Sequence, residues 1–472
     1  ERRAAPDAGG VPMSDRTPPD WLVTLADFAT RTPLSALSPA ALHKARWVLA
    51  DCIPVIAAGM AQPEMQTFVE RHLEGRAPGR AWVIGTARRA DPLDAALLGG
   101  TAGTWLELDE GNLFAHGHPG IQVVPGAVAL AQQLGSSGAD LLRAIALGYE
   151  VSSRVSRATA TRIAVHPHGT YGVIGTAVAA ACLRGFSAAQ MLEVLNVSAT
   201  MGMASSRQTL LDGATVRNIF TGHSGFMGLT AASLVECGFT GEVDSYRTVY
   251  GRIYGEAFDP QKVVDGLGSE WLIALNYFKL YPTGRYAHSA IDALLDLLQA
   301  VPGGRLDPAA IERIEVRAYA RCAMLAEKAV VSSFGARFSV PFILATLLHH
   351  GRSSLAAYEQ PAVDNPAIQA IAKKVDLQED PAYSARYPAE QPVDLKIVMR
   401  DGTAYEGHSV VTKGEPATPH SDDELKAKFR ELGIPAWGTD ATERLLDALM
   451  AIERIDDFAT FSDVLDTGGR TC

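Results

Sequence analysis

The stretch DLKIVMRDGTAYEGHSVV (394–411) distinguishes this chain from a purely helical protein. Apolar and polar residues alternate on both sides of Asp401-Gly402, and this dipeptide between two alternating runs is a strong signal for a β-hairpin. A second run with the same periodicity, IERIEVRAYA (311–320), predicts a further strand. The sequence therefore predicts a β-sheet in its C-terminal half.

Helical patterns lie between these strands in the sequence and also N-terminal to them. We expect helices at about 338–350 and 365–375, because apolar residues recur there at helical spacing. Together with the strands they make residues 276–411 a predicted α+β domain. The change from helical to mixed patterns occurs near residue 276.

Residues 21–275 are predicted to be almost entirely helical. Ser38-Pro39 is a typical helix start, because proline is favoured at the first helical position. The other candidate helices cover 91–104, 120–134, 139–160, 169–184, 187–204, 222–237 and 259–275. In the fourth of these, Gly169, Gly172 and Gly175 are expected on one helix face, where they permit close packing.

The C-terminal part is predicted to return to helix. Ser421 and Glu424 form a capping box that opens one helix, and a last helix is expected at about 440–455. The predicted fold class is therefore mostly α: an all-helical domain of residues 21–275 and 412–465 with an inserted α+β domain. Residues 1–20 have no periodic apolar pattern and are expected to be flexible.

The composition narrows the classes of function. The 472 residues are 47% hydrophobic and 20% charged, with a net charge of −11, so binding to nucleic acid or anionic membranes is not expected. The sequence contains no run of about 20 apolar residues, so no membrane-spanning helix is predicted. Five scattered cysteines without a CxxC motif fit a cytoplasmic protein without disulfides or structural zinc. No GxGxxG or Walker A motif supports a bound nucleotide.

The densest polar cluster is TWLELDEGNLFAHGHPG (104–120). It places Glu107, Asp109, His116 and His118 between two apolar helical patterns. Burying a charge is costly unless it is paired or functional, and acids beside imidazoles suit proton transfer. A solvated loop with helix-capping acids is the alternative.

A second histidine pair occurs in VHPHGTYG (165–172), with His166 and His168. Together with His116 and His118 it admits a metallohydrolase as an alternative, because an HxH pair can ligate a metal. In that class, however, the pair ends a barrel strand, and no alternation of strands and helices occurs here. We therefore expect no metal, and a packing or capping role for His168 stays open.

Two cationic clusters complete the candidates. SSRQTLLDGATVRN (205–218) contains two arginines, Arg207 and Arg217, whose planar guanidinium groups suit carboxylate binding. NYFKLYPTGRYAHSAID (276–292), at the predicted domain junction, contains Lys279, Arg285 and His288. These groups indicate an anionic ligand with carboxylates. For the first cluster, the alternative is that its arginines are ordinary surface residues. For the second, the alternative is a hinge between the domains held by salt bridges.

In combination these segments resemble the MmgE/PrpD family, which includes 2-methylcitrate dehydratase, cis-aconitate decarboxylase and iminodisuccinate epimerase. The matching segments, in chain order, are ELDEGN…GHPG (107–120), GYE (148–150), VHPHGTYGVIGTAVAAA (165–181), DGATVRN…G (212–222), CGFTG (237–241), FKLYPTGRYAHSAID (278–292), ARFSVPFILA (336–345) and PHSDDELKAKF (419–429). The resemblance implies an all-helical domain with an inserted α+β lid, a homodimer, and no cofactor.

The resemblance also implies an active site between the two domains. Transferred position by position, it gives catalytic roles to Glu107, Asp109, His118 and His166, and substrate-binding roles to Lys279, Arg217, Arg285 and His288. The decarboxylase branch has Asp, Lys and His where this chain has Glu107, Arg217 and Gly284. These differences speak against decarboxylation, and the weight of the family favours a dehydratase.

The expected chemistry is removal of a proton from the carbon next to a carboxylate. Lys279, Arg217 and Arg285 would bind carboxylates and stabilise an enediolate-like charge, while His118 and His166 act as base and acid. Loss of a β-hydroxyl then makes a dehydratase, return of the proton to the other face an epimerase, and loss of CO2 a decarboxylase. The alternative from another class is a non-enzymatic carboxylate-binding protein. His166→Gln discriminates the two, because ligand affinity should survive in either case and turnover should be lost only in an enzyme.

Overall fold

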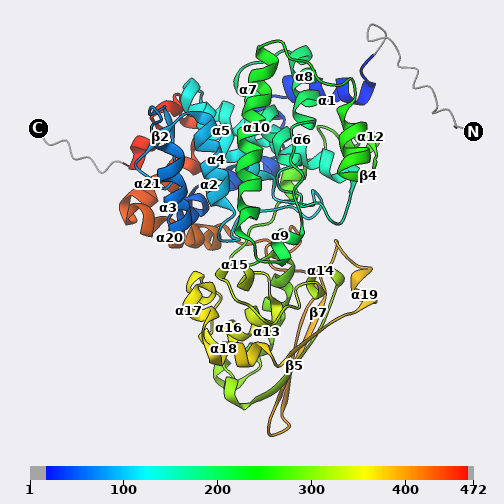
Figure 1. Cartoon of the computed structure of the whole chain (residues 1–472), viewed down its shortest axis with the longest axis vertical. Helices are drawn as coiled ribbons and strands as arrows, with labels where there is room; N and C mark the ends of the chain where they lie inside the picture. Colours follow the sequence, from blue (N-terminus) through cyan, green and yellow to red (C-terminus); the bar gives the residue numbers. More distant parts are fainter. Residues whose placement is uncertain (1–16, 466–472) are drawn as a thin grey trace, which may run out of the picture.

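The computed structural model describes residues 17–465 and shows a molecule in two parts (Figure 1). One part is a large body of helices, and the other contains a four-stranded sheet, each with its own hydrophobic core. The predicted fold class, mostly α with a smaller α+β part, is confirmed. Residues 1–16 of the predicted flexible segment lie outside the described residues, and helix α1 already begins at Asp20.

The helical part is built around closely packed apolar helices. Its longer helices are α1 (Asp20–Arg31), α2 (Pro39–Met60), α3 (Pro63–Leu73), α4 (Pro92–Gly103), α5 (Pro119–Leu134), α6 (Gly138–Ala158), α7 (Tyr171–Leu183), α8 (Ala188–Ala199), α10 (Ile219–Glu236), α20 (Asp422–Trp437) and α21 (Thr439–Met450). Helix α7 packs against α5, α6 and α10. Two short ribbons, β1 (Ala81–Trp82) with β2 (Arg89–Ala90) and β3 (Thr159–Thr161) with β4 (Gly255–Phe258), accompany the helices.

The C-terminal helices return to the helical part, where α20 packs on α2 (Figure 1). The predicted capping box is confirmed: Ser421 and Glu424 each bond the other's backbone N–H at the start of α20. Further along α20, the ammonium of Lys428 lies 2.6 Å from Asp51 of α2, and both side chains are buried. Lys428 also donates to the carbonyl of Leu108 at 2.8 Å, so the returning helix supports the acidic segment from behind.

The helix predicted at 259–275 is wrong. The structure has a short helix α12 (Pro260–Val264) and a 3-10 turn η5 (Leu272–Leu275) instead. Buried Arg154 explains the difference. Its guanidinium donates hydrogen bonds to four backbone carbonyls of this segment, those of Val263, Asp265, Gly266 and Glu270. A continuous helix would use those carbonyls for its own hydrogen bonds.

The glycine face predicted for 169–184 is partly wrong. Helix α7 begins at Tyr171, so Gly169 precedes it and has a left-handed φ of 84°. Gly172 and Gly175 lie inside α7, and a Cβ on either would collide with α5, at Gln122 or Val123. Close helix packing is therefore the role of these two glycines.

The α+β part contains a sheet in the order β6-β5-β7-β8, formed by β6 (Val375–Glu379), β5 (Ile311–Ala318), β7 (Val393–Met399) and β8 (Ala404–Ser409). Strands β7 and β8 form the predicted hairpin, and β5 is the predicted strand. Strand β6 pairs parallel to β5 and was not predicted; it follows α18 (Pro366–Ala372). Helix α13 (His288–Gln299) packs on β7 and β8, and α16 (Val340–His350) packs on α13.

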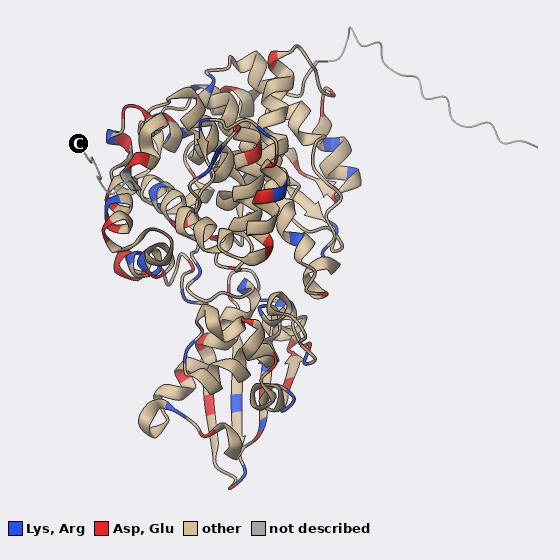
Figure 2. Ribbon diagram, turned by 60° about the vertical axis from the view of Figure 1, so that its left-hand side comes forward, with Lys and Arg blue, Asp and Glu red and all other residues tan. Residues whose placement is uncertain are grey.

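Charge is distributed over the whole fold. Lys and Arg are interspersed with Asp and Glu on both parts of the molecule (Figure 2). Among the described helices, none combines the length and the apolar character needed to cross a bilayer.

Candidate active site

A pocket lies where the helical and α+β parts meet. It encloses about 610 Å³ of space not filled by atoms, part of it open to solvent. The helical part contributes wall residues between Glu107 and His118, between His166 and His168, and Arg207, Leu210, Arg217 and Tyr277; the α+β part contributes residues 284–286, Leu325, Phe338 and Tyr387. Ligand sites commonly occupy such junctions.

The floor of the pocket is a buried network of two acids and two cations. Arg217 lies 2.6 Å from one oxygen of Glu107, and Lys279 lies 3.3 Å from the other. Lys279 also lies 3.4 Å from Asp109. Glu107 has a left-handed φ of 55°, a conformation that costs a non-glycine residue about 1 kcal/mol. Lys279 holds this turn by donating to the carbonyl of Glu107 at 3.2 Å.

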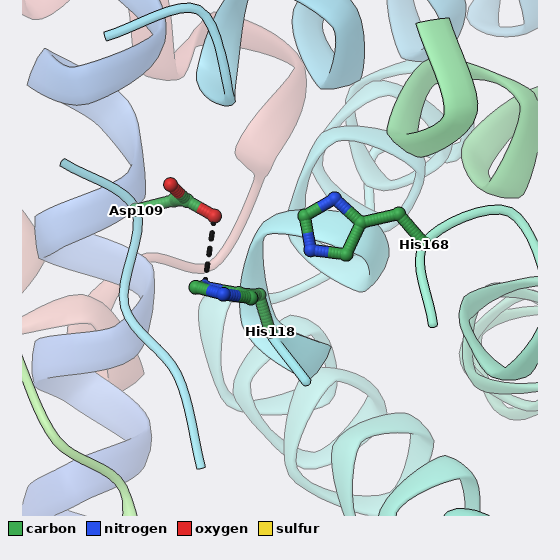
Figure 3. A group of neighbouring side chains, drawn as sticks. All are labelled: Asp109, His118 and His168. Atoms are coloured by element: carbon green, nitrogen blue, oxygen red, sulfur yellow. Dashed lines mark ion pairs between the residues drawn. The ribbon is translucent and has the colours of Figure 1, made fainter. Parts of the chain in front are cut away.

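An acid–imidazole pair connects this network to the pocket. Nδ1 of His118 lies 2.9 Å from Asp109, whose side chain is 0% exposed, whereas the His118 side chain is 14% exposed. The same nitrogen contacts the carbonyl of Glu110. Burial by itself would raise the pKa of Asp109, but the charges of Lys279 and His118 outweigh it and hold the pKa well below its usual range. Figure 3 shows Asp109 facing the His118 ring, with His168 on the other side.

Two further imidazoles complete a row of three. The rings of His166 and His168 are 4.6 Å apart, and those of His168 and His118 are 4.9 Å apart, both edge to face. The backbone N–H of His168 donates to Nδ1 of His166 at 3.1 Å. Burial, and next the charge of Arg217, lower the pKa of both His166 and His168 well below the usual value. Both imidazoles are therefore neutral near pH 7.

The predicted substrate-binding residues divide into two groups. Arg217 and Arg285 reach the pocket wall. Lys279 is fully buried among the acids of the floor. His288 is buried too, and its Nδ1 accepts from Arg285 at 3.1 Å while its Nε2 donates to the carbonyl of Thr283 at 3.3 Å. Neither ring nitrogen of His288 is left for a ligand.

Arg285 is held at the wall from several sides. It lies 2.6 Å from Glu415, stacks 4.4 Å from the centre of the Tyr277 ring and donates to the carbonyl of Lys413 at 3.1 Å. Its charge is therefore balanced within the protein, as is that of Arg217.

Several wall residues were not identified from the sequence. These are the aromatic and apolar residues Tyr277, Tyr286, Tyr387, Leu325 and Phe338. Tyr277 needs Gly111 beside it, because a Cβ there would lie 2.3 Å from the Tyr277 hydroxyl oxygen, but the two residues are far apart in the sequence. His116, with a left-handed φ of 54°, is exposed at the pocket rim.

One group could in principle hold a metal ion. Asp109, His118 and His168 each bring a ligand atom within 4.8 Å of the others (Figure 3). The ammonium of Lys279, 3.4 Å from Asp109, opposes a divalent cation at this place. The charge distribution thus fits an acid–imidazole pair better than a metal centre.

Glu110 gives the site a pH-dependent stability. Its carboxyl is 0% exposed. It accepts a bond from the backbone N–H of Ile121 at 3.1 Å. Burial, with a smaller contribution from Asp109, raises its pKa from 4.5 to about 8. A raised pKa in the folded state means that its stabilising contribution is complete below pH 4.5 and is lost as the pH rises through about 8.

We therefore expect Glu110→Gln to reduce the loss of thermal stability between about pH 5 and about pH 9, because the amide cannot ionise. The measurement is the melting temperature of both proteins across this range. Glu193→Gln is the matched control, because Glu193 is a half-buried acid of α8 that also accepts from a backbone N–H, that of Gly241 at 3.1 Å. Parallel curves for wild type and Glu110→Gln would contradict the assignment.

Comparison with known proteins gives one family for both halves of the chain. The family model of the MmgE/PrpD N-terminal domain matches residues 23–260, and that of the MmgE/PrpD C-terminal domain matches residues 281–453. Cis-aconitate decarboxylase of Aspergillus terreus is 22% identical over 90% of this chain and 91% of its own length. The Homo sapiens cis-aconitate decarboxylase is 24% identical over 80% of each chain. The 2-methylcitrate dehydratase of Escherichia coli (strain K12) is 21% identical over 82% of this chain and 83% of its own length.

Proposed function

The chain belongs to the MmgE/PrpD family, whose similar members are lyases, and we propose that it is a lyase that removes a proton next to a carboxylate of a small di- or tricarboxylate. The observation that carries this proposal is the Asp109–His118 pair at the edge of a pocket with three arginines in its wall. Dehydration, as in 2-methylcitrate dehydratase, is the reaction we propose first.

His118 is the proposed base. Its Nδ1 faces two oxygens, of Asp109 and of the Glu110 backbone, so this nitrogen carries the proton in the neutral ring. Nε2 is then the nitrogen that can accept a proton from the substrate. The buried carboxylate of Asp109 stabilises the positive charge that the ring acquires.

His166 is the proposed proton donor to the leaving group. Its Nδ1 accepts from the backbone N–H of His168 at 3.1 Å, so its own proton resides on Nε2. In dehydration, the electron pair left by the α-proton forms the double bond, and the β-hydroxyl leaves as water with the Nε2 proton of His166. The proton that His118 has taken up then restores the neutral ring of His166 along the row of imidazoles. Arg217 stabilises the negative charge that develops on the carboxylate in between.

Decarboxylation is the second candidate, because the cis-aconitate decarboxylases match the chain over 80% and 90% of its length. In that reaction the bond to a carboxylate breaks, CO2 leaves, and the remaining carbanion takes a proton. The same row of imidazoles can deliver that proton, and Arg217 can stabilise the carbanion.

A proton NMR time course with 2-methylcitrate, citrate and cis-aconitate tests the proposal. Collapse of the methyl doublet of 2-methylcitrate to a singlet on a double bond, or a vinylic proton from citrate, would indicate dehydration. Loss of one carboxylate from cis-aconitate would indicate the second candidate. No conversion of any of the three, by protein whose melting temperature rises with one of them, would contradict the proposed reaction. A homodimer stays a prediction, which the molar mass in solution from light scattering would check.

A further inference from the structure

Arg207 is an arginine of the pocket wall that the proposed chemistry does not use. Arg207 directly follows Ser206, which forms an isolated antiparallel β-bridge with Val165. This backbone pairing joins the loop that carries Arg207 to the loop that carries His166. Its Nε donates to the carbonyl of Ile163 at 2.7 Å and its Nη2 to that of Val165 at 3.1 Å. These bonds fix the guanidinium plane while the side chain stays only half-buried.

Arg207 differs from the other arginines in the wall because it has no acidic partner among the described residues. Arg217 is paired with Glu107 and Arg285 with Glu415, each at 2.6 Å. Within residues 17–465, no ion pair joins Arg207 to an acid. The groups that interact with it are the hydroxyls of Tyr286 and Tyr387 and a second cation.

That second cation is Arg321, which belongs to the α+β part, whereas Arg207 belongs to the helical part. It lies in the short helix α14 (Ala320–Ala323), which packs against the turn that carries Tyr286. Through this turn it lies next to the pocket, because Tyr286 belongs to the wall, and its charge acts on three further wall residues, Arg207, His116 and Tyr387. In the described part of the chain Arg321 makes neither a hydrogen bond nor an ion pair.

Two cations that lie within reach of each other's charge and have no acidic partner repel, and a bound anion relieves this repulsion. We propose that Arg207 and Arg321 form a second carboxylate subsite at the exposed end of the pocket. This subsite holds a carboxylate remote from the carbon that reacts at His118, and it rests on the proposed function. Because the two arginines belong to different parts of the fold, a substrate with carboxylates at both ends connects those parts when it binds.

Calorimetric titration with a graded set of carboxylates tests this subsite. The probes are tricarballylate, glutarate and butyrate, which carry three, two and one carboxylate. Arg207→Gln should weaken tricarballylate and glutarate by about tenfold or more, since a charge-assisted bond is lost, and leave butyrate unchanged. The matched control is Arg162→Gln, an exposed arginine nearby that also donates to backbone carbonyls and lies outside the pocket wall.

Equal affinities of wild type and Arg207→Gln for all three probes would overturn the subsite, and so would an equal loss for all three. Arg321→Gln should reproduce the selective loss, which keeps the test valid if Arg207→Gln does not fold. A selective loss without turnover of any substrate in the NMR assay would leave the subsite standing and the proposed reaction refuted. Turnover in the NMR assay together with unchanged affinities of the variants would support the proposed reaction and refute the subsite.

Discussion

His118→Asn should lower kcat by about 10²- to 10⁴-fold, the usual contribution of a positioned acid–base group. Asparagine retains a side-chain polar group near Asp109 but has no nitrogen that can take up a proton. Because Arg217 and Arg285 remain in the wall, KM should change much less than kcat. Steady-state kinetics on the substrate identified by NMR measures both constants.

Two further variants bracket this result. Asp109→Asn should also lower kcat strongly, and the double variant should be scarcely slower than His118→Asn, because the two residues act as a unit. His350→Asn, an exposed histidine at the end of α16, should behave as wild type. A kcat within about threefold of wild type for His118→Asn would remove it from the role of base.

The fold was predictable where local signals decide it. The capping box of Ser421 and Glu424 and the hairpin at Asp401-Gly402 need only neighbouring residues, and both occur in the structure. The segment 259–275 was mispredicted because buried Arg154, from another helix, binds its carbonyls. Such a long-range contact leaves no trace in the periodicity of the segment itself.

The candidate site was predictable as a set of residue types but not as an arrangement. His118 and Asp109 are close in sequence, so their pairing follows from one motif. Lys279 lies 170 residues from Asp109, and nothing local indicates that its ammonium is buried between acids. For Arg207 the sequence left a surface role equally open, because its anchoring carbonyls come from a loop 42 to 44 residues earlier.

Lys279→Met should reduce the free energy of unfolding by about 3–5 kcal/mol, the cost of removing one partner from a buried charge network. Its ammonium lies 3.3 Å from Glu107 and 3.4 Å from Asp109, and all three side chains are at most 2% exposed. Without it, two carboxylates face each other in the protein interior with Arg217 as the remaining cation. Chemical denaturation at neutral pH measures the loss.

The matched control is Lys426→Met, because Lys426 forms an exposed pair with Asp423 at 3.7 Å. Such a pair contributes at most about 1 kcal/mol. Adding Asp109→Asn to Lys279→Met should recover part of the lost stability, because one of the unpaired charges is then removed. A loss for Lys279→Met no larger than that for Lys426→Met would mean that the buried network does not stabilise the site.

The central claim is that this pocket removes a proton next to a carboxylate, with His118 as the base. The most direct test is incorporation of deuterium from D2O at that carbon, followed by NMR for wild type and His118→Asn under the same conditions. The account predicts that wild type incorporates deuterium or forms the alkene, and that His118→Asn does neither at a measurable rate. Equal rates of exchange in the two proteins would contradict it.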